Sequence, residues 1–210
     1  MSYTTQIDAA KKGIFTKQMA DVLKEEKHIN KEWLMERVAN GRIAIPANKN
    51  HINLIGKGVG DGLLTKVNVN LGVSEACNNM EMEIDKVRNA INLKADAIMD
   101  LSIFGDTRAF RRRLVEESPV MLGTVPMYDA VAKLGKNIKD MSVDDLFRVT
   151  EEHMIDGIDF LTIHAGLNRT CVERVQKNPR LTHIVSRGGS ILYEWMLKND
   201  KENPFYENYD

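Results

Sequence analysis

The segment that decides the fold is Ala97-Ile98-Met99-Asp100-Leu101-Ser102, a short apolar run that ends in polar residues. Amphipathic segments lie on both sides of it, and their apolar residues recur at helical spacing over 82–93 and 107–116. A strand between two helices, repeated along a chain, is typical of parallel strands joined by right-handed helical crossovers. The segment therefore predicts an α/β fold.

The same alternation continues from Thr65 onward. The strands that we expect are Lys66–Leu71, Ala97–Leu101, Val120–Val125, Phe160–His164 and Thr182–Ser186. The remaining expected helices span 128–134, 143–155, 171–177 and 191–198. We therefore predict the first units of a (β/α) TIM-type barrel over residues 65–210. About five βα units fill only about five-eighths of an eight-stranded barrel, so we expect the chain to be truncated.

A small helical region and a Gly-rich linker are predicted over residues 1–64. Thr16 and Asn30 are typical N-cap residues, and each precedes an amphipathic segment. Four glycines follow between residues 48 and 62, which we interpret as a linker or mobile loop.

The charge balance excludes several functional classes. The chain has 29 Lys+Arg and 30 Asp+Glu, hence a net charge of −1, and lacks the basic excess typical of nucleic-acid or membrane-surface binding. Without an apolar run of roughly 18–20 residues or a secretory pattern, a cytoplasmic protein is expected. The spacing of Cys77 and Cys171 predicts neither a disulfide framework nor a metal site. The run Arg111-Arg112-Arg113 predicts a solvated helix face.

Polar residues stand at the C-terminal end of every predicted strand. In a (β/α) barrel these ends form one rim that carries the active site, whereas a doubly wound sheet binds ligands mainly at one switch point. Five polar strand ends therefore favour the barrel.

The segment Ser186-Arg187-Gly188-Gly189-Ser190 is the best candidate for a phosphate site. Its glycines let the backbone approach an anion where a following helix presents free N–H groups, and Arg187 adds charge. The alternative is a strand-to-helix turn capped by Ser190. The position on the rim favours phosphate.

Four further rim residues are candidate ligand contacts. His164 closes an apolar strand, Asn70 shares a strand face with Asn68, and Met99 and Tyr128 could line a planar ligand. Each also has a structural alternative: a satisfied histidine, a turn residue, core packing, or packing at a helix start.

Seven stretches together resemble the N-terminal half of the phosphomethylpyrimidine synthase family, radical S-adenosylmethionine enzymes of thiamine biosynthesis. In chain order they are Ala44-Ile45-Pro46-Ala47-Asn48, Thr65-Lys66-Val67-Asn68-Val69-Asn70-Leu71-Gly72, Ile98-Met99-Asp100-Leu101-Ser102, Gly123-Thr124-Val125-Pro126-Met127-Tyr128, Thr162-Ile163-His164-Ala165-Gly166, Ile184-Val185-Ser186-Arg187-Gly188-Gly189-Ser190 and Lys201-Glu202-Asn203-Pro204-Phe205.

The resemblance implies that the substrate is aminoimidazole ribotide, rearranged to hydroxymethylpyrimidine phosphate with release of carbon monoxide and formate. It also implies a homodimer for the full-length protein. Carried over one by one, the implied substrate contacts are Asn70, Met99, Tyr128, His164, Ser186, Arg187 and Gly188.

The chain departs from the family in its cofactor ligands. Members hold a 4Fe-4S cluster with a C-terminal Cys-x-x-Cys-x-x-x-x-Cys and a zinc-type metal with two later histidines, and neither set occurs here. Cluster thiolates are needed to activate S-adenosylmethionine, so we expect this chain alone to bind no cofactor and to be catalytically incompetent. The alternative is a non-catalytic ribotide-binding half-barrel or a subunit of a split enzyme. The sequence leaves a pyrimidine and a benzimidazole product equally open.

Overall fold

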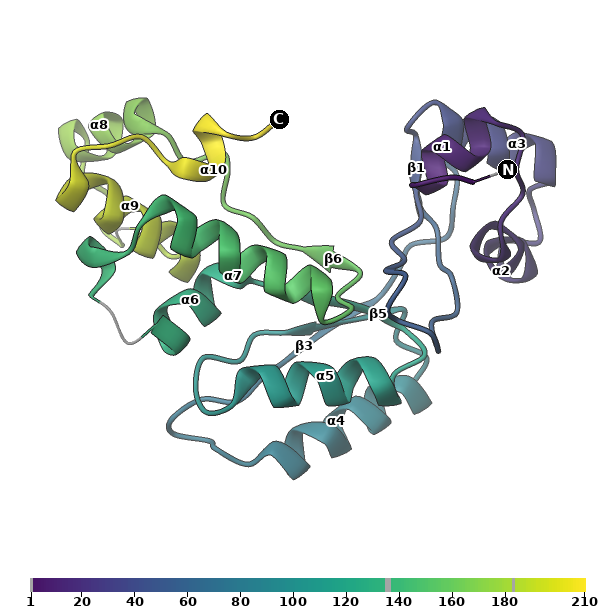
Figure 1. Ribbon diagram of the computed structural model, residues 1–210, viewed down its shortest axis with the longest axis horizontal. Coiled ribbons are helices and arrows are strands. Elements are labelled where there is room, and N and C mark those ends of the chain that lie inside the picture. Colours follow the sequence, from purple (N-terminus) through teal and green to yellow (C-terminus); the bar gives the residue numbers. More distant parts are fainter. Residues whose placement is uncertain (1, 135–136, 183) are drawn as a thin grey trace.

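A parallel sheet forms the centre of the computed structural model, which describes residues 2–134, 137–182 and 184–210. In this described part, four strands lie side by side in the order β3-β4-β5-β6. They are β3 (Asn68–Leu71), β4 (Ala97–Asp100), β5 (Met121–Thr124) and β6 (Phe160–Leu161), and each neighbouring pair is parallel (Figure 1). The predicted α/β class is confirmed. The barrel itself stays a prediction.

Two helices cover one face of this sheet (Figure 1). These are α4 (Met80–Asn92) and α5 (Thr107–Glu117), and their apolar residues pack onto alternate strand residues such as Ile98 and Leu122. Since side chains alternate along a strand, the residues between them point to the opposite face. Met99 is one of these, and the register pairs it with Asn70 on one side and Gly123 on the other.

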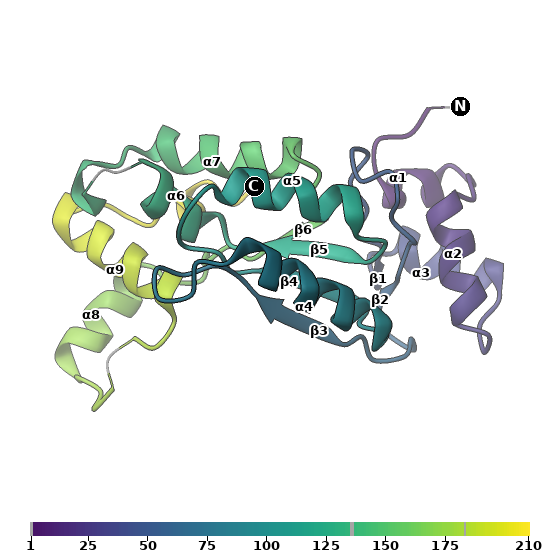
Figure 2. The same cartoon turned by 90° about the horizontal axis from the view of Figure 1, so that it is seen from below.

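A second apolar cluster lies toward the C-terminal ends of the strands. The elements around it are α6 (Pro126–Leu134), the 3-10 helix η1 (Ile138–Asp140), α7 (Val143–Ile155), α8 (Arg169–Lys177), α9 (Arg187–Asn199) and α10 (Pro204–Glu207). Trp195 is buried there, and its Nε1 donates a hydrogen bond to the carbonyl of Met141 at 2.8 Å. Figure 2 shows α8 and α9 at the end of the molecule opposite to the N-terminal helices.

The N-terminal helices pack around their own apolar cluster. They are α1 (Gln6–Lys11), α2 (Lys17–Glu25) and α3 (Lys31–Ala39), followed by the antiparallel pair β1 (Ile43–Ala44) and β2 (Val59–Gly60). Thr16 and Asn30 cap α2 and α3 as expected, because their side chains accept hydrogen bonds from the first helical turns. Helix α1 was not expected. The division of the chain at residue 64 stays a prediction.

The last two expected strands differ from the structure. The strand expected over 160–164 ends at Leu161, and in the range 182–186 the described residues form no strand, while His183 lies outside them. Val185 is 80% exposed, and the hydroxyl of Ser190 donates to the carbonyls of Ile184 and Ser186, so this backbone turns into a helix. Helix α9 accordingly begins at Arg187 with Ser186 as its N-cap, and the alternative cap Ser190 is wrong.

A buried ion pair fastens segment 48–51 to the sheet. His51 donates from Nδ1 to Asp159 at 2.7 Å and from Nε2 to the Ser118 carbonyl at 2.7 Å, so the ring is an imidazolium. The Asp159 carboxylate also accepts from the backbone N–H groups of Asn48 (2.8 Å) and Leu122 (2.9 Å). The start of the Gly-rich segment is thus held at the N-terminal ends of β5 and β6.

Across the described ranges, no helix combines the length and the apolar character needed to cross a bilayer.

The His51 pair gives a pH-dependent stability. Burial opposes the charged ring, but the hydrogen bond and charge of Asp159 and the Ser118 carbonyl outweigh it and raise the pKa of His51 above its usual value. The stabilisation is therefore complete below about pH 6.5, the unfolded value, and is lost as the pH rises through the raised pKa. We expect His51→Gln to lower the free energy of unfolding by about 3 kcal/mol at pH 6 and by less at pH 9.

Urea unfolding of both proteins at each pH checks this expectation. His28→Gln is the control, because His28 is an exposed histidine whose hydrogen bond is to the Gly62 carbonyl. A His51→Gln effect that stays constant or grows between pH 6 and pH 9 contradicts the assignment of an imidazolium.

Candidate functional site

The structure brings His164 and Ser186 into contact beyond the C-terminal ends of the strands. The Nε2 atom of His164 lies 2.9 Å from Oγ of Ser186. The same hydroxyl oxygen accepts a hydrogen bond from the Gly189 N–H at 3.2 Å and so caps α9. The histidine that follows β6 is therefore tied to the N-terminus of α9, where free N–H groups favour an anion.

Gly188 lets the His164 ring approach the helix. A Cβ atom on Gly188 would lie 2.2 Å from Cε1 of His164, which no side chain tolerates, so the imidazole packs directly on the backbone of α9. Gly188 is buried inside the first turn of that helix rather than in a flexible loop. Its small size is what the contact requires.

The other nitrogen of His164 is unsatisfied. Nδ1 is buried and has no hydrogen-bond partner among the atoms that the structure describes. Burial also lowers the pKa of His164, so the ring is neutral at pH 7. Because a buried polar atom without a partner is costly, this nitrogen is a place where a polar ligand atom would be stabilised.

Tyr128 and Arg187 complete this group. Tyr128 lies in the first turn of α6, and the guanidinium carbon of Arg187 lies 5.7 Å from the centre of its ring, a cation–π contact. Arg187 itself is exposed, so its charge remains accessible to an anion.

Asn70 and Met99 form a second group on the open face of the sheet. They are register partners on β3 and β4. Asn70 accepts a hydrogen bond from the Asn68 amide at 2.8 Å, and the Thr162 hydroxyl faces the sulfur of Met99 at 4.0 Å. Thr162 comes two residues before His164, so one segment leads from this group to the first.

A buried network of charged and polar side chains anchors α6 at Asp129, the residue that follows Tyr128. Asp129 accepts hydrogen bonds from the Thr107 hydroxyl, from Arg111 at 3.3 Å and from Nε2 of His153 at 2.9 Å. Burial alone would raise the pKa of Asp129, but these donors and the nearby positive charge lower it to about 2. Asp129 is therefore an anion that anchors the helix that carries Tyr128.

The expectation of a solvated face is wrong for Arg111, which is 1% exposed. Its guanidinium also reaches Asp156 at 2.9 Å, and Arg108 and Arg112 bind the same carboxylate. The sequence holds a signal for this placement. Arg111 lies four residues after Thr107 and three or four before Leu114 and Val115, hence on the buried face of α5.

The residues of this chain do not fit an iron–sulfur cluster. Cys77 and Cys171 are free thiols. Within residues 2–134, 137–182 and 184–210, no group of three or more His, Cys, Asp or Glu side chains is placed to hold a metal ion. A cluster that activates S-adenosylmethionine needs three cysteine thiolates, and the two cysteines of this chain do not supply them.

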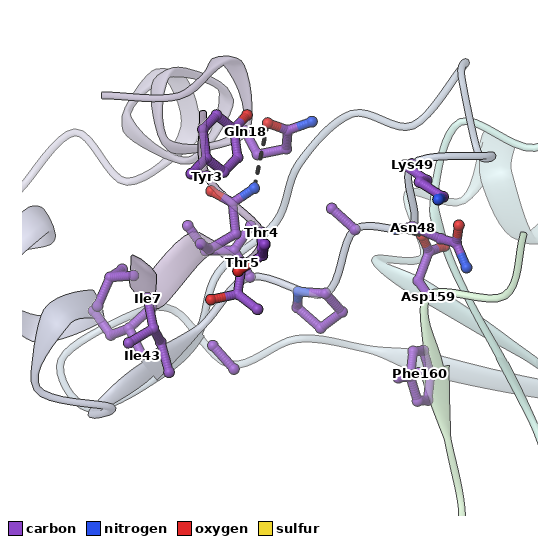
Figure 3. A pocket seen from close by; sticks show the side chains of 16 residues that line it. Tyr3, Thr4, Thr5, Ile7, Gln18, Ile43, Asn48, Lys49, Asp159 and Phe160 are labelled. Carbon is purple, nitrogen blue, oxygen red and sulfur yellow. Dashed lines mark hydrogen bonds between the residues drawn. The ribbon is translucent and has the colours of Figure 1, made fainter. Parts of the chain in front are cut away.

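A pocket of about 730 Å³ lies elsewhere, between the N-terminal helices and the start of β6 (Figure 3). Thr4, Gln18 and Ile43 line one side of it, and Asn48 and Phe160 lie on the other. It is at the N-terminal ends of the strands, the end opposite to the polar rim. None of the predicted site residues lines it.

Comparisons with known proteins point to one family. The sequence profile described as "Radical SAM ThiC family" matches residues 5–210. A phosphomethylpyrimidine synthase of Clostridium tetani is 58% identical over all 210 residues, which cover 46% of that protein. The synthases of Clostridium perfringens and Clostridium botulinum are 58% and 56% identical over the whole chain, which covers 48% of each. The chain thus spans about half the length of the relatives it matches.

The contact between Gly188 and His164 predicts an unfavourable alanine substitution. Replacing a helical glycine usually stabilises a helix by up to about 1 kcal/mol. Here the added methyl group must displace the imidazole, so we expect Gly188→Ala to lower the free energy of unfolding by about 1–3 kcal/mol. Gly166→Ala is the control, because a Cβ there meets nothing within 4 Å. Equal stability of the two variants in urea unfolding would show that the ring does not pack on Gly188.

Asp100 gives a second prediction. This carboxyl is buried at the end of β4 and accepts a hydrogen bond from the Ser102 N–H at 2.9 Å, and burial raises its pKa to about 6. The pKa of this carboxyl in the unfolded chain is about 3.9. Ionisation is therefore harder in the folded protein, and the free energy of unfolding falls as the pH rises through the folded-state pKa. We expect Asp100→Asn, which keeps the acceptor, to be about 2 kcal/mol more stable than wild type at pH 8 and not at pH 4. Thermal or urea unfolding at the two pH values decides, and a variant less stable at pH 8 refutes the prediction.

Proposed function

This chain belongs to the radical SAM ThiC family, and from that premise we propose that it supplies the substrate-binding part of a phosphomethylpyrimidine synthase. The proposed reaction of the longer protein converts aminoimidazole ribotide to hydroxymethylpyrimidine phosphate in thiamine biosynthesis. The observation that carries the proposal is the convergence of His164, Ser186 and Arg187 at the N-terminus of α9.

The ribotide phosphate binds at the start of α9 in this proposal. The helix has 13 residues, and its first turn offers backbone N–H groups and the positive end of its dipole. Arg187 adds a permanent positive charge and Ser186 a hydroxyl. Gly188 lies in this first turn and contributes its backbone N–H, and its lack of a side chain also allows the close approach of His164.

His164 holds the polar edge of the substrate. We assign to His164 the tautomer in which Nε2–H donates to the Ser186 oxygen, so that Nδ1 carries a lone pair that accepts a hydrogen bond from a substrate N–H or O–H. Tyr128 and Met99 line the planar ring of the imidazole, and Asn70 supplies an amide at the sheet face. These residues bind and orient the substrate.

The rest of the proposed enzyme lies outside this chain. The four parallel strands make an arc of a (β/α) barrel, and the half that the longer relatives have in addition completes it. That half would hold the iron–sulfur cluster and the zinc-type metal, and the cluster would supply radical chemistry with S-adenosylmethionine. A cytoplasmic homodimer is part of the same proposal.

The test joins this chain to the C-terminal half of the Clostridium tetani relative and measures formation of hydroxymethylpyrimidine phosphate from aminoimidazole ribotide. We expect activity in the joined protein and a loss of about 10- to 100-fold in kcat/KM for His164→Ala and Arg187→Ala, the range for a lost hydrogen bond to a charged or polar ligand. Arg180→Ala, at an exposed arginine beyond α8, is the matched control.

Two outcomes contradict the proposal in different ways. Wild-type kcat/KM in both site variants removes the residue assignments. A joined protein that binds the ribotide in calorimetry but forms no product favours the alternative, a ribotide-binding half-barrel without catalysis.

A further inference from the structure

We propose that Asn203 is a positioning residue: its side-chain amide fixes the backbone that presents His164 to the ligand. The inference rests on the proposed function only in taking His164 as a ligand contact. Asn203 lies in the Lys201-Glu202-Asn203-Pro204-Phe205 stretch, which contributes no residue to the candidate site described above.

The loop after β6 lacks the support of a strand. The Thr162 N–H still donates to the Thr124 carbonyl of β5 at 2.9 Å, but β6 has ended at Leu161 and the chain then leaves the sheet. Beyond this point the side-chain amide nitrogen of Asn203 holds the backbone in place of hydrogen bonds to a neighbouring strand. It donates to the carbonyl of His164 at 2.8 Å and to that of Leu167 at 2.7 Å.

Asn203 is itself held rigidly. It is fully buried, and its Oδ1 accepts a hydrogen bond from the Phe205 N–H at 3.0 Å, which caps α10. Phe205 is buried against Phe147 of α7, with 5.4 Å between the ring centres. The side chain that grips the His164 loop is thus anchored in the second apolar cluster.

The neighbouring Glu202 fixes the other end of the same loop. Its carboxylate accepts from the N–H of Arg169 at 3.1 and 3.2 Å and from the N–H of Asn203 at 2.7 Å. Residues 202 and 203 therefore hold both ends of the loop from His164 to Arg169.

An asparagine is the residue that this position requires. It offers two N–H donors for the two carbonyls and a carbonyl acceptor for the cap. Without the amide, the part-buried carbonyls of His164 and Leu167 lose this donor, and the loop relaxes. The His164 ring would then leave its close contact with Gly188 and become more exposed to water.

The experiment is a histidine titration of the 210-residue chain by NMR, without any ligand. Asn203→Ser keeps an acceptor for the α10 cap, adds no charge and loses the amide that reaches both carbonyls. The matched control is Asn208→Ser, because the Asn208 amide donates to the Pro204 carbonyl at 2.9 Å and does not contact the His164 loop. The His164 signals are assigned by their loss in His164→Gln.

We expect the ring signals of His164 to shift in Asn203→Ser and its pKa to rise toward about 6.5, the ordinary value, as burial is lost. The signals of His51 and His153 stay in place, and Asn208→Ser changes none of them. A folded Asn203→Ser protein with an unchanged His164 titration overturns the proposal.

A second measurement decides if Asn203→Ser does not fold. In the wild-type chain, both side-chain amide protons of Asn203 exchange slowly with solvent if they are bound to the two carbonyls, and those of Asn208 exchange fast. Fast exchange at Asn203 overturns the proposal. Neither readout involves the ribotide, so a failure of the proposed function leaves both unaffected.

Discussion

The carboxylate of Asp159 is the interaction on which the arrangement of the chain depends. One side chain at the start of β6 accepts hydrogen bonds from the His51 ring and from the N–H groups of Asn48 and Leu122. It therefore joins the segment after the N-terminal helices to two neighbouring strands. A buried carboxylate is stable only with such donors, and the same donors set where β6 begins. His164 follows five residues later, so the position of the candidate site depends on where Asp159 is held.

The sequence predicts the helices well because their signals are local. Ser142 and Asp145 form a capping box at α7, and Asn30 caps α3, at the positions where these residue types occur. Strands are harder to predict because a strand exists only with a partner. The run at 182–186 has the composition of a strand. Its Ile184 and Ser186 carbonyls, however, accept hydrogen bonds from the Ser190 hydroxyl at the start of α9.

The candidate site could be predicted as a set of residues but not as a set of contacts. His164 and Ser186 stand out because each closes an apolar run, yet their hydrogen bond and the packing on Gly188 depend on the tertiary fold. The supporting groups are hidden for a different reason. Asp129, Arg111 and His153 lie on three separate helices, and no spacing in the sequence shows that Arg111 and His153 both bind the Asp129 carboxylate inside the protein.

The direct contact between His164 and α9 has a consequence for how this chain can vary. The distance between them is set by the imidazole packed on Gly188 and not by the connection between α8 and α9. Two residues of that connection are strongly exposed, Leu181 at 99% and Val185 at 80%. Insertions there would lengthen an exposed loop without separating His164 from the start of α9, since exposed connections with few contacts tolerate insertions best. Length variation among relatives should therefore concentrate in this connection, and a reporter peptide could be placed there.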